Sequence, residues 1–257
     1  MRFLKGHGTE NDFVLLPDPD GSLELTDDLV RRLCDRRAGI GADGVLRVVP
    51  VAKEPDAAAY LGEAAWFMDY RNADGSVAEM CGNGVRVYAR YLVTEGLAAA
   101  GPMRLATRGG VKDVDVDGDD ITVDMGVAVV GETLTVDGLP ATAVDMGNPH
   151  AVVHVASVEA LGTLAPERLD LNVEYVEDVA PFHLRMRVHE RGVGETRSCG
   201  TGACAAVVAT VLRTGEPRGA QWDVDVPGGR LVVTWQEDGH VLLTGPAVLV
   251  AEGVWTG

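Results

Sequence analysis

The chain reads CGNG at residues 81–84 and CGTG at residues 199–202, so a short motif recurs after 118 residues. An apolar stretch follows each copy directly, Val85–Leu92 in the first and Ala203–Leu212 in the second. Stretches that are apolar on all sides are typical of helices buried inside a domain. We therefore predict an α+β protein of two pseudo-symmetric domains, each a β-barrel-like sheet around one central helix.

Most of the remaining sequence alternates apolar and polar residues with the period of two that is typical of β-strands. Alternating stretches flank Asp117-Gly118 and Asp238-Gly239, and such dipeptides favour hairpin turns. Further strands are predicted over His150–Val155, Asn172–Val176 and Leu184–His189. A third helix is predicted over Asp27–Arg37, because Thr26 can cap it and its charges suit the helix dipole.

The repeat places the domain boundary near Gly126, after the strand-like stretch Ile121–Met125. The N-terminal lobe would then span residues 1–126 and the C-terminal lobe residues 127–245. Residues 246–257 would be a final segment that could return to the first lobe. An asparagine lies near the start of each half, Asn11 in the first and Asn148 in the second.

The charge balance argues against nucleic acid and membrane partners. Thirty-nine acidic residues against 22 basic ones give a formal net charge of −17, which repels phosphate backbones and anionic lipids. The N-terminal stretch has no apolar signal core, and no apolar run could span a bilayer. The expected location is therefore the cytoplasm, where the four cysteines would be reduced thiols.

A cysteine at the start of a helix is suited to acid–base chemistry. The first N–H groups of a helix have no partner within it, so they can bind a carboxylate or stabilise a thiolate and lower the pKa of the thiol. Two such sites on facing domains suggest one thiol on each side of a substrate carbon. One thiolate would remove a proton, the other thiol would return one to the opposite face, and the helix N-termini would stabilise the carbanion. Neither metal nor organic cofactor is expected.

The motifs together resemble those of the diaminopimelate epimerases. The resemblance rests on stretches that span nearly the whole chain: Asn11-Asp12-Phe13, Asn72–Ser76, Met80–Arg86, Gly147–His150, Glu190–Thr196 and Cys199–Cys204. It implies a cofactor-independent isomerase that interconverts LL- and meso-diaminopimelate for lysine and peptidoglycan synthesis. It also implies the two-lobed epimerase fold and a small-molecule substrate, with a homodimer as the family's usual assembly.

The same resemblance assigns roles to individual residues. Cys81 and Cys199 are the acid–base pair, and His150 and Glu190 tune the pKa of the thiols or touch the reacting ammonium. The residues that it places around the substrate are Asn11, Asn72, Gly82, Asn83, Asn148, Asn172, Glu190, Arg191, Gly200 and Thr201. Arg191 would hold the distal carboxylate with two hydrogen bonds.

The sequence departs from the family pattern at two positions. Many members have Gln where this chain has Gly44, so no side-chain contact carries over there. Members often place a dimer-contact tyrosine where this chain has Ala251, which weakens the case for the homodimer.

Several sequence features also have simpler interpretations, and other functions fit part of the pattern. Cys34 and Cys204 are expected to pack as small core residues. Gly39–Gly44 matches the dinucleotide pattern GxGxxG, but a helix precedes it and a strand follows, the reverse of a Rossmann turn. A paired-cysteine racemase such as proline racemase, and a non-catalytic amino-acid-binding protein, remain as alternatives. A pyridoxal phosphate enzyme is least favoured, because the chain has only three lysines.

Overall fold

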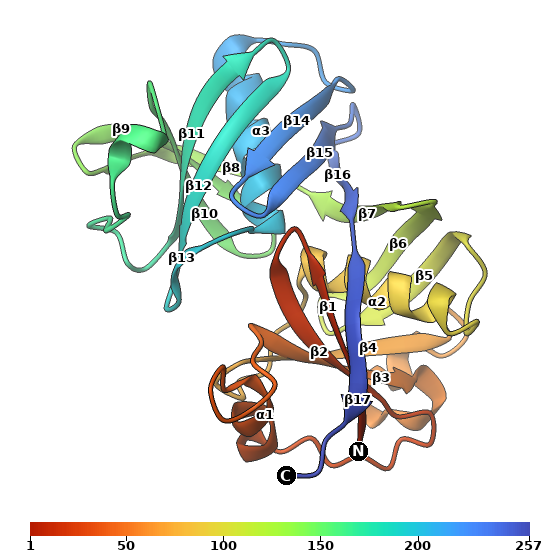
Figure 1. Ribbon diagram of the computed structural model, residues 1–257. Helices are drawn as coiled ribbons and strands as arrows, with labels where there is room; N and C mark the ends of the chain where they lie inside the picture. The colour runs from red at the N-terminus through yellow and green to blue at the C-terminus, as the bar shows by residue number, and fades with distance from the viewer. The chain divides into compact units, whose positions relative to one another are not determined.

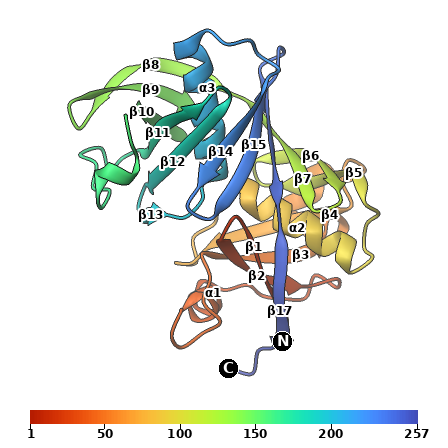
Figure 2. The same cartoon turned by 45° about the horizontal axis from the view of Figure 1, so that its top comes forward.

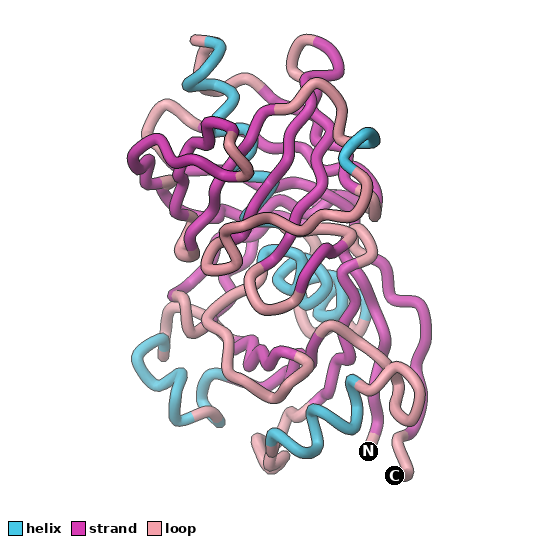
Figure 3. The backbone as a smooth tube through the Cα atoms, turned by 90° about the vertical axis from the view of Figure 1, so that its left-hand side faces the viewer, coloured by secondary structure: helices cyan, strands magenta, loops and turns pink.

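The computed structural model describes all 257 residues, and the chain forms two compact units (Figure 1). The first comprises Met1–Val123 together with Pro246–Gly257, and the second comprises Asp124–Gly245. Strands are far more abundant than helices in both units (Figure 3). None of the helices is long and apolar enough to span a bilayer.

The first unit is a curved sheet around helix α2 (Gly82–Thr94). Its strands are β1 (Arg2–Gly8), β2 (Asn11–Pro17), β3 (Gly44–Pro50), β4 (Trp66–Asn72), β5 (Gly101–Thr107), β6 (Gly110–Asp117), β7 (Asp120–Val127) and β17 (Val248–Val254). They pair in the order β17-β1-β2-β3-β4-β5-β6-β7, with β2–β3 and β4–β5 parallel and the other pairs antiparallel. Strand β17 thus lies beside β1 although the two come from opposite ends of the sequence (Figure 1).

The second unit repeats this order of pairing around helix α3 (Gly200–Thr214). Its strands are β8 (Val129–Val136), β9 (Leu139–Asp145), β10 (Pro149–His154), β11 (Asn172–Ala180), β12 (His183–Glu190), β13 (Gly194–Thr196), β14 (Gln221–Val226), β15 (Gly229–Trp235) and β16 (His240–Pro246). The order is β8-β9-β10-β11-β12-β14-β15-β16, with β10–β11 and β12–β14 parallel. The short strand β13 pairs with β12. The predicted fold class is therefore confirmed, with sheets that are barrel-like but not closed.

Both central helices are buried on nearly all sides, as their apolar sequences predict. Helix α2 packs against β1, β2, β3, β4, β6 and β17, and every residue from Gly82 to Ala89 is buried. Helix α3 packs against β9, β10, β11, β12 and β15, and Gly202–Val211 is buried throughout (Figure 2). Each helix therefore forms the core of its own unit, and its first residue is fixed by the surrounding sheet.

The predicted hairpins are confirmed, and one predicted helix end is wrong. Strands β6 and β7 flank Asp117-Gly118, and β15 and β16 flank Asp238-Gly239. Helix α1 (Asp27–Cys34) is capped by Thr26 as predicted but ends three residues before Arg37. The reason is local: the Asp35 carboxylate accepts hydrogen bonds from the N–H groups of Arg37 and Ala38, which turns the chain out of the helix.

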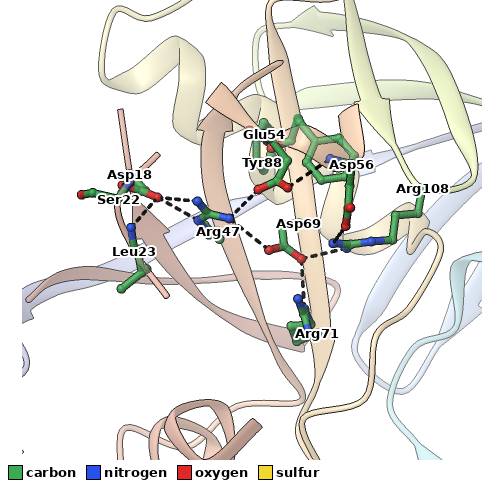
Figure 4. Close-up of polar contacts among 11 residues, drawn as sticks. Asp18, Ser22, Leu23, Arg47, Glu54, Asp56, Asp69, Arg71, Tyr88 and Arg108 are labelled. Carbon is green, nitrogen blue, oxygen red and sulfur yellow. Dashed lines mark hydrogen bonds and ion pairs between the residues drawn. The ribbon is translucent and has the colours of Figure 1, made fainter. Parts of the chain in front are cut away.

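A buried group of ion pairs crosses the sheet of the first unit (Figure 4). The guanidinium of Arg47 on β3 lies 2.7 Å from Asp18, 2.6 Å from Glu54 and 3.5 Å from Asp69. Asp69 on β4 also pairs with Arg108 at 2.7 Å. The group ties the segment around Glu54, including the short 3-10 helices η1 (Val51–Lys53) and η2 (Pro55–Tyr60), to the central strands of the unit.

Candidate active site

Cys81 is the residue that begins helix α2 in the first unit. Its backbone is extended, and its carbonyl accepts the first helical hydrogen bond from Val85 at 2.8 Å. Its Sγ lies 3.6 Å from Oδ1 of Asn11. The same oxygen accepts a hydrogen bond from Nδ2 of Asn83, at 3.2 Å. The structure thus brings together three predicted site residues, Asn11, Cys81 and Asn83, at the N-terminal turn of α2.

The orientation of the Asn11 side chain is set by Asp43, which sequence reasoning did not select. Nδ2 of Asn11 donates to Oδ2 of Asp43 at 2.7 Å, so Oδ1 is left to face Cys81 and Asn83. Burial raises the pKa of Asp43, and the nearby Asp12 carboxylate adds to this. Arg36 pairs with both carboxylates at 2.7 Å. Hydrogen bonds from Arg36 and Lys5 outweigh the effect of burial on Asp12 and lower its pKa to about 2.

Asn72 lies at the end of β4, where its Nδ2 donates to Oγ of Ser76 at 3.0 Å. Its strand partner is Gly44 on β3. A Cβ at Gly44 would lie 2.5 Å from the carbonyl oxygen of Arg71 and 2.7 Å from the ring of Tyr70. The glycine at this departure from the family pattern is therefore required by the packing of this chain.

Cys199 begins helix α3 in the second unit and is buried. The N–H of Gly202 donates to its Sγ at 3.4 Å, and Oγ1 of Thr201 lies 3.4 Å from the same atom. These contacts favour the thiolate, but burial raises the pKa of Cys199 well above its usual value, and the charges of Glu190 and Glu174 add to this. The prediction that the helix start lowers the pKa of this thiol is therefore wrong, because burial and the two carboxylates outweigh the helix N-terminus.

The remaining predicted residues of the second unit surround the start of β10 and the end of β12. The side chain of Asn172 bridges the two, since Nδ2 donates to the carbonyl of Pro149 and Oδ1 accepts from the N–H of Arg191, both at 3.0 Å. The side chain of Arg191 is exposed. Glu190 accepts a hydrogen bond from the hydroxyl of Thr196. Asn172 thus joins two strands through both ends of its side-chain amide.

His150 is buried on β10 between two side chains. Its Nδ1 lies 2.6 Å from Oε1 of Glu174, and its Nε2 lies 3.0 Å from Oδ1 of Asn148. Glu174 is completely buried, and sequence reasoning missed it. The sequence did contain a signal for it. Glu174 follows Asn172 by two positions in a predicted strand, and side chains two positions apart lie on the same face of a strand.

Known proteins match this chain over nearly its whole length. A family model described as diaminopimelate epimerase matches residues 3–131 and 142–250. The chain belongs to the diaminopimelate epimerase family. It is 55% identical to the diaminopimelate epimerase of Streptomyces coelicolor, over 98% of this chain and 94% of that protein. It is 52% identical to that of Thermobifida fusca, over 98% and 97%. The family resemblance predicted from the motifs is thereby confirmed.

The solved structures add support for the epimerase fold alone. A Bacillus anthracis phenazine biosynthesis protein of the PhzF family superimposes with a TM-score of 0.76 over 98% of both chains, at 15% identity. At that identity the likeness carries no information about the reaction. The diaminopimelate epimerase family is therefore assigned from the sequence matches, and the architecture from both.

Two cysteines of this family member lie outside the candidate site. Cys34 packs in the apolar cluster around α1, where burial raises its pKa to about 11. Cys204 is completely buried within α3. Both positions match the predicted core role. No group of three or more His, Cys, Asp or Glu residues in the structure is arranged to bind a metal ion.

Proposed function

We propose that this protein is an isomerase that interconverts LL- and meso-diaminopimelate without a cofactor, with Cys81 and Cys199 as its acid–base pair. One thiolate removes the α-proton of the substrate, and the other thiol delivers a proton to the opposite face of the same carbon. A single observation carries the proposal. In two units with the same order of strand pairing, a cysteine begins each buried central helix. Family membership supplies the substrate.

The helix starts provide what the carbanion intermediate requires. As the α-proton leaves, negative charge develops on the substrate carboxylate. N–H groups at a helix N-terminus can stabilise this charge more in the transition state than in the ground state. In this proposal the backbone of Gly82-Asn83 and of Gly200-Thr201 binds the reacting carboxylate, and His150 and Glu190 act on the protonation of Cys199.

The remaining predicted residues bind the rest of the substrate. Asn11 and Asn148 border the reacting amino acid, and Arg191 grips the carboxylate of the distal one. Asn72 and Asn172 complete the distal site, Asn172 by holding the backbone of Arg191 in place. The exposed Arg191 side chain supports its role, since the guanidinium is accessible to a substrate carboxylate.

The decisive experiment is exchange of the α-proton in deuterated water, with LL-diaminopimelate and no added cofactor. The wild-type protein should incorporate deuterium at the α-carbon as it forms the meso isomer. Cys81→Ala and Cys199→Ala should each abolish epimerisation while the fold survives, because each removes one of the two proton carriers. Proline and hydroxyproline, tested in parallel, should not be turned over.

Cys204→Ala is the matched control, since Cys204 is a buried thiol on the same helix as Cys199 but outside the candidate site. It should retain turnover. Full activity in either Cys81→Ala or Cys199→Ala would refute the two-thiol mechanism. Binding of diaminopimelate without any solvent exchange would instead identify a non-catalytic binding protein.

The assembly and the cellular location also remain proposals. The family's homodimer is the expected assembly although Ala251 weakens the case for it, and the sequence favours a cytoplasmic location. Light scattering on the purified protein tests the first, since a monomer of this chain has a mass of 27.1 kDa.

A further inference from the structure

Glu174 is an acidic side chain in a place where acids are rarely found. It lies on β11 between Val152 on β10 and Val188 on β12, and its exposed fraction is 0%. Removing a carboxylate from water is costly unless a partner compensates its charge. The only ion-pair partner of Glu174 is His150, and its second oxygen, Oε2, has no hydrogen-bond partner. A residue so placed calls for an explanation beyond packing.

The carboxylate lies against the first turn of α3, beside Cys199. A Cβ added at Gly202 would lie 2.7 Å from Oε1 of Glu174 and 3.3 Å from Cβ of Cys199. Gly202 therefore leaves the space that the carboxylate occupies. Glu174, the start of α3 and His150 form one packed group within the second unit.

Counting hydrogens shows what this group does to His150. One ring nitrogen, Nδ1, lies 2.6 Å from the Glu174 carboxylate, and the other, Nε2, lies 3.0 Å from the carbonyl oxygen of the Asn148 side chain. The oxygen of the Asn148 amide can only accept, so Nε2 carries a hydrogen, and one further hydrogen lies between Nδ1 and Oε1 of Glu174. With these two hydrogens the His150–Glu174 pair has zero net charge, which offsets the cost of burying the carboxyl group.

We propose that Glu174 is a positioning residue of the epimerase site, acting through His150 on the side chain of Asn148. By sharing a hydrogen with Nδ1, it fixes the ring so that Nε2–H holds Oδ1 of Asn148. The two Nδ2 hydrogens of Asn148 then point away from the ring and are available to the substrate. This inference rests on the proposed function, in which Asn148 borders the reacting amino acid.

The first unit contains a related arrangement. There Asp43 holds the amide of Asn11 directly, at 2.7 Å from Nδ2, and leaves Oδ1 facing Cys81. In the second unit the imidazole of His150 lies between Glu174 and Asn148. There the oxygen end of the asparagine amide is held, rather than the nitrogen end. Each unit thus uses a carboxylate to fix which end of an asparagine side chain is presented.

Two substitutions at one position test the proposal. Glu174→Ala removes the acceptor and frees the ring and Asn148, so kcat should fall by about tenfold to a hundredfold, as expected for misplaced binding groups. Glu174→Gln can donate its amide N–H to Nδ1 and leave Nε2–H on Asn148, and the pair keeps zero net charge. It should therefore restore most of the lost turnover.

Glu177→Ala is the matched control. Glu177 lies on the same strand, but its Oε2 accepts from the N–H of Val158, away from His150. Its variant should keep the wild-type kcat. Circular dichroism and thermal unfolding of all three variants separate loss of fold from loss of positioning, with kinetics measured well below each unfolding midpoint.

Nitrogen-15 NMR of the histidine rings supplies a readout that folding alone would not change. Nε2 of His150 should carry a hydrogen both in the wild type and in Glu174→Gln. The proposal is overturned if Glu174→Ala retains full turnover, if Glu174→Gln is as impaired as Glu174→Ala, or if Nε2 carries no hydrogen in the wild type. If the wild type never exchanges the α-proton of diaminopimelate, the proposed function fails instead. The NMR measurement on the His150 ring would still test its contacts with Glu174 and Asn148.

Discussion

The two units build the same helix start in different electrostatic surroundings. Cys81 is partly exposed and lies beside the amide of Asn11. Cys199 is buried, and the carboxylates of Glu190 and Glu174 raise its pKa further. A duplicated backbone therefore does not produce two equivalent thiols. This suits a reaction that needs one thiolate and one thiol at the same time, because identical surroundings would give both the same protonation state.

The units also differ in where they place buried charge. The first has the ion-pair group around Arg47, remote from the helix start in sequence and held by several acids. The second buries a single acid beside its cysteine and pairs it with a histidine. The group around Arg47 thus supports the sheet, whereas Glu174 supports the site. Three substitutions or measurements can test this contrast.

The largest expected effect is on the stability of the first unit. Arg47→Met removes the cation that compensates Asp18, Glu54 and Asp69, so buried carboxylates lose their partner. Breaking a buried group in this way costs about 3–5 kcal/mol in free energy of unfolding. Urea unfolding followed by circular dichroism measures it. Arg104→Met, which breaks only the exposed pairs with Glu63 and Asp113, is the control and should cost far less.

A loss below about 1 kcal/mol for Arg47→Met would show that the buried group contributes no more to the free energy of unfolding than exposed ion pairs do. Buried charge would then not be what stabilises the sheet of the first unit. The reactivity of Cys199 should not change in this variant, since Arg47 and its ion-pair partners all belong to the first unit.

A pair of glycine substitutions tests the two helix starts directly. At Gly202 an added Cβ would lie 2.7 Å from Oε1 of Glu174, closer than atoms normally approach, whereas at Gly84 its nearest neighbour would be Cδ2 of Leu46 at 3.3 Å. Gly202→Ala should therefore displace Glu174 or Cys199 and lower kcat by about a hundredfold, the cost expected of a displacement near 1 Å. Gly84→Ala should be much milder.

Deuterium exchange and steady-state kinetics on both variants measure the difference. Equal losses of kcat would mean that the first turns of α2 and α3 tolerate a side chain equally. The carboxylate beside Cys199 would then have no steric role. Thermal unfolding of each variant shows whether the helix itself survives the substitution.

Local features of this fold were predictable from the sequence, and long-range ones were not. The helix starts at Cys81 and Cys199 and the hairpin at Asp117-Gly118 follow from glycines, apolar runs and turn residues that are neighbours in the chain. The end of α1 was missed because it depends on whether Asp35 captures backbone N–H groups, which apolar periodicity does not show.

The supporting carboxylates were missed for a different reason. Glu174 meets His150 only because β11 runs parallel to β10 in one particular register, after a connection with little regular structure. Asp43 meets Asn11 through the parallel pairing of β2 and β3. Such registers are set by tertiary packing, so the candidate site residues could be named from motifs while the residues that orient them could not.

The smallest expected effect is a difference in alkylation rate between the two thiols. The thiolate is the reactive form, and burial, followed by Glu190 and Glu174, raises the pKa of Cys199. A raised pKa means that little thiolate exists at neutral pH and that more appears as the pH rises. Iodoacetamide at pH 7 should therefore modify Cys81 first, and the rate at Cys199 should still be rising above pH 8.5, about the pKa of a free cysteine.

Peptide mapping by mass spectrometry assigns each modification, and Glu190→Gln separates charge from access. Removing this carboxylate lowers the pKa of Cys199 without opening the site, so its alkylation at pH 7 should accelerate, by about tenfold for each pKa unit. If Cys199 reacts as fast as Cys81 in the wild type, the thiols are equivalent despite their surroundings. If Glu190→Gln leaves a slow Cys199 unchanged, access alone protects it, and the asymmetry between the units is steric rather than electrostatic.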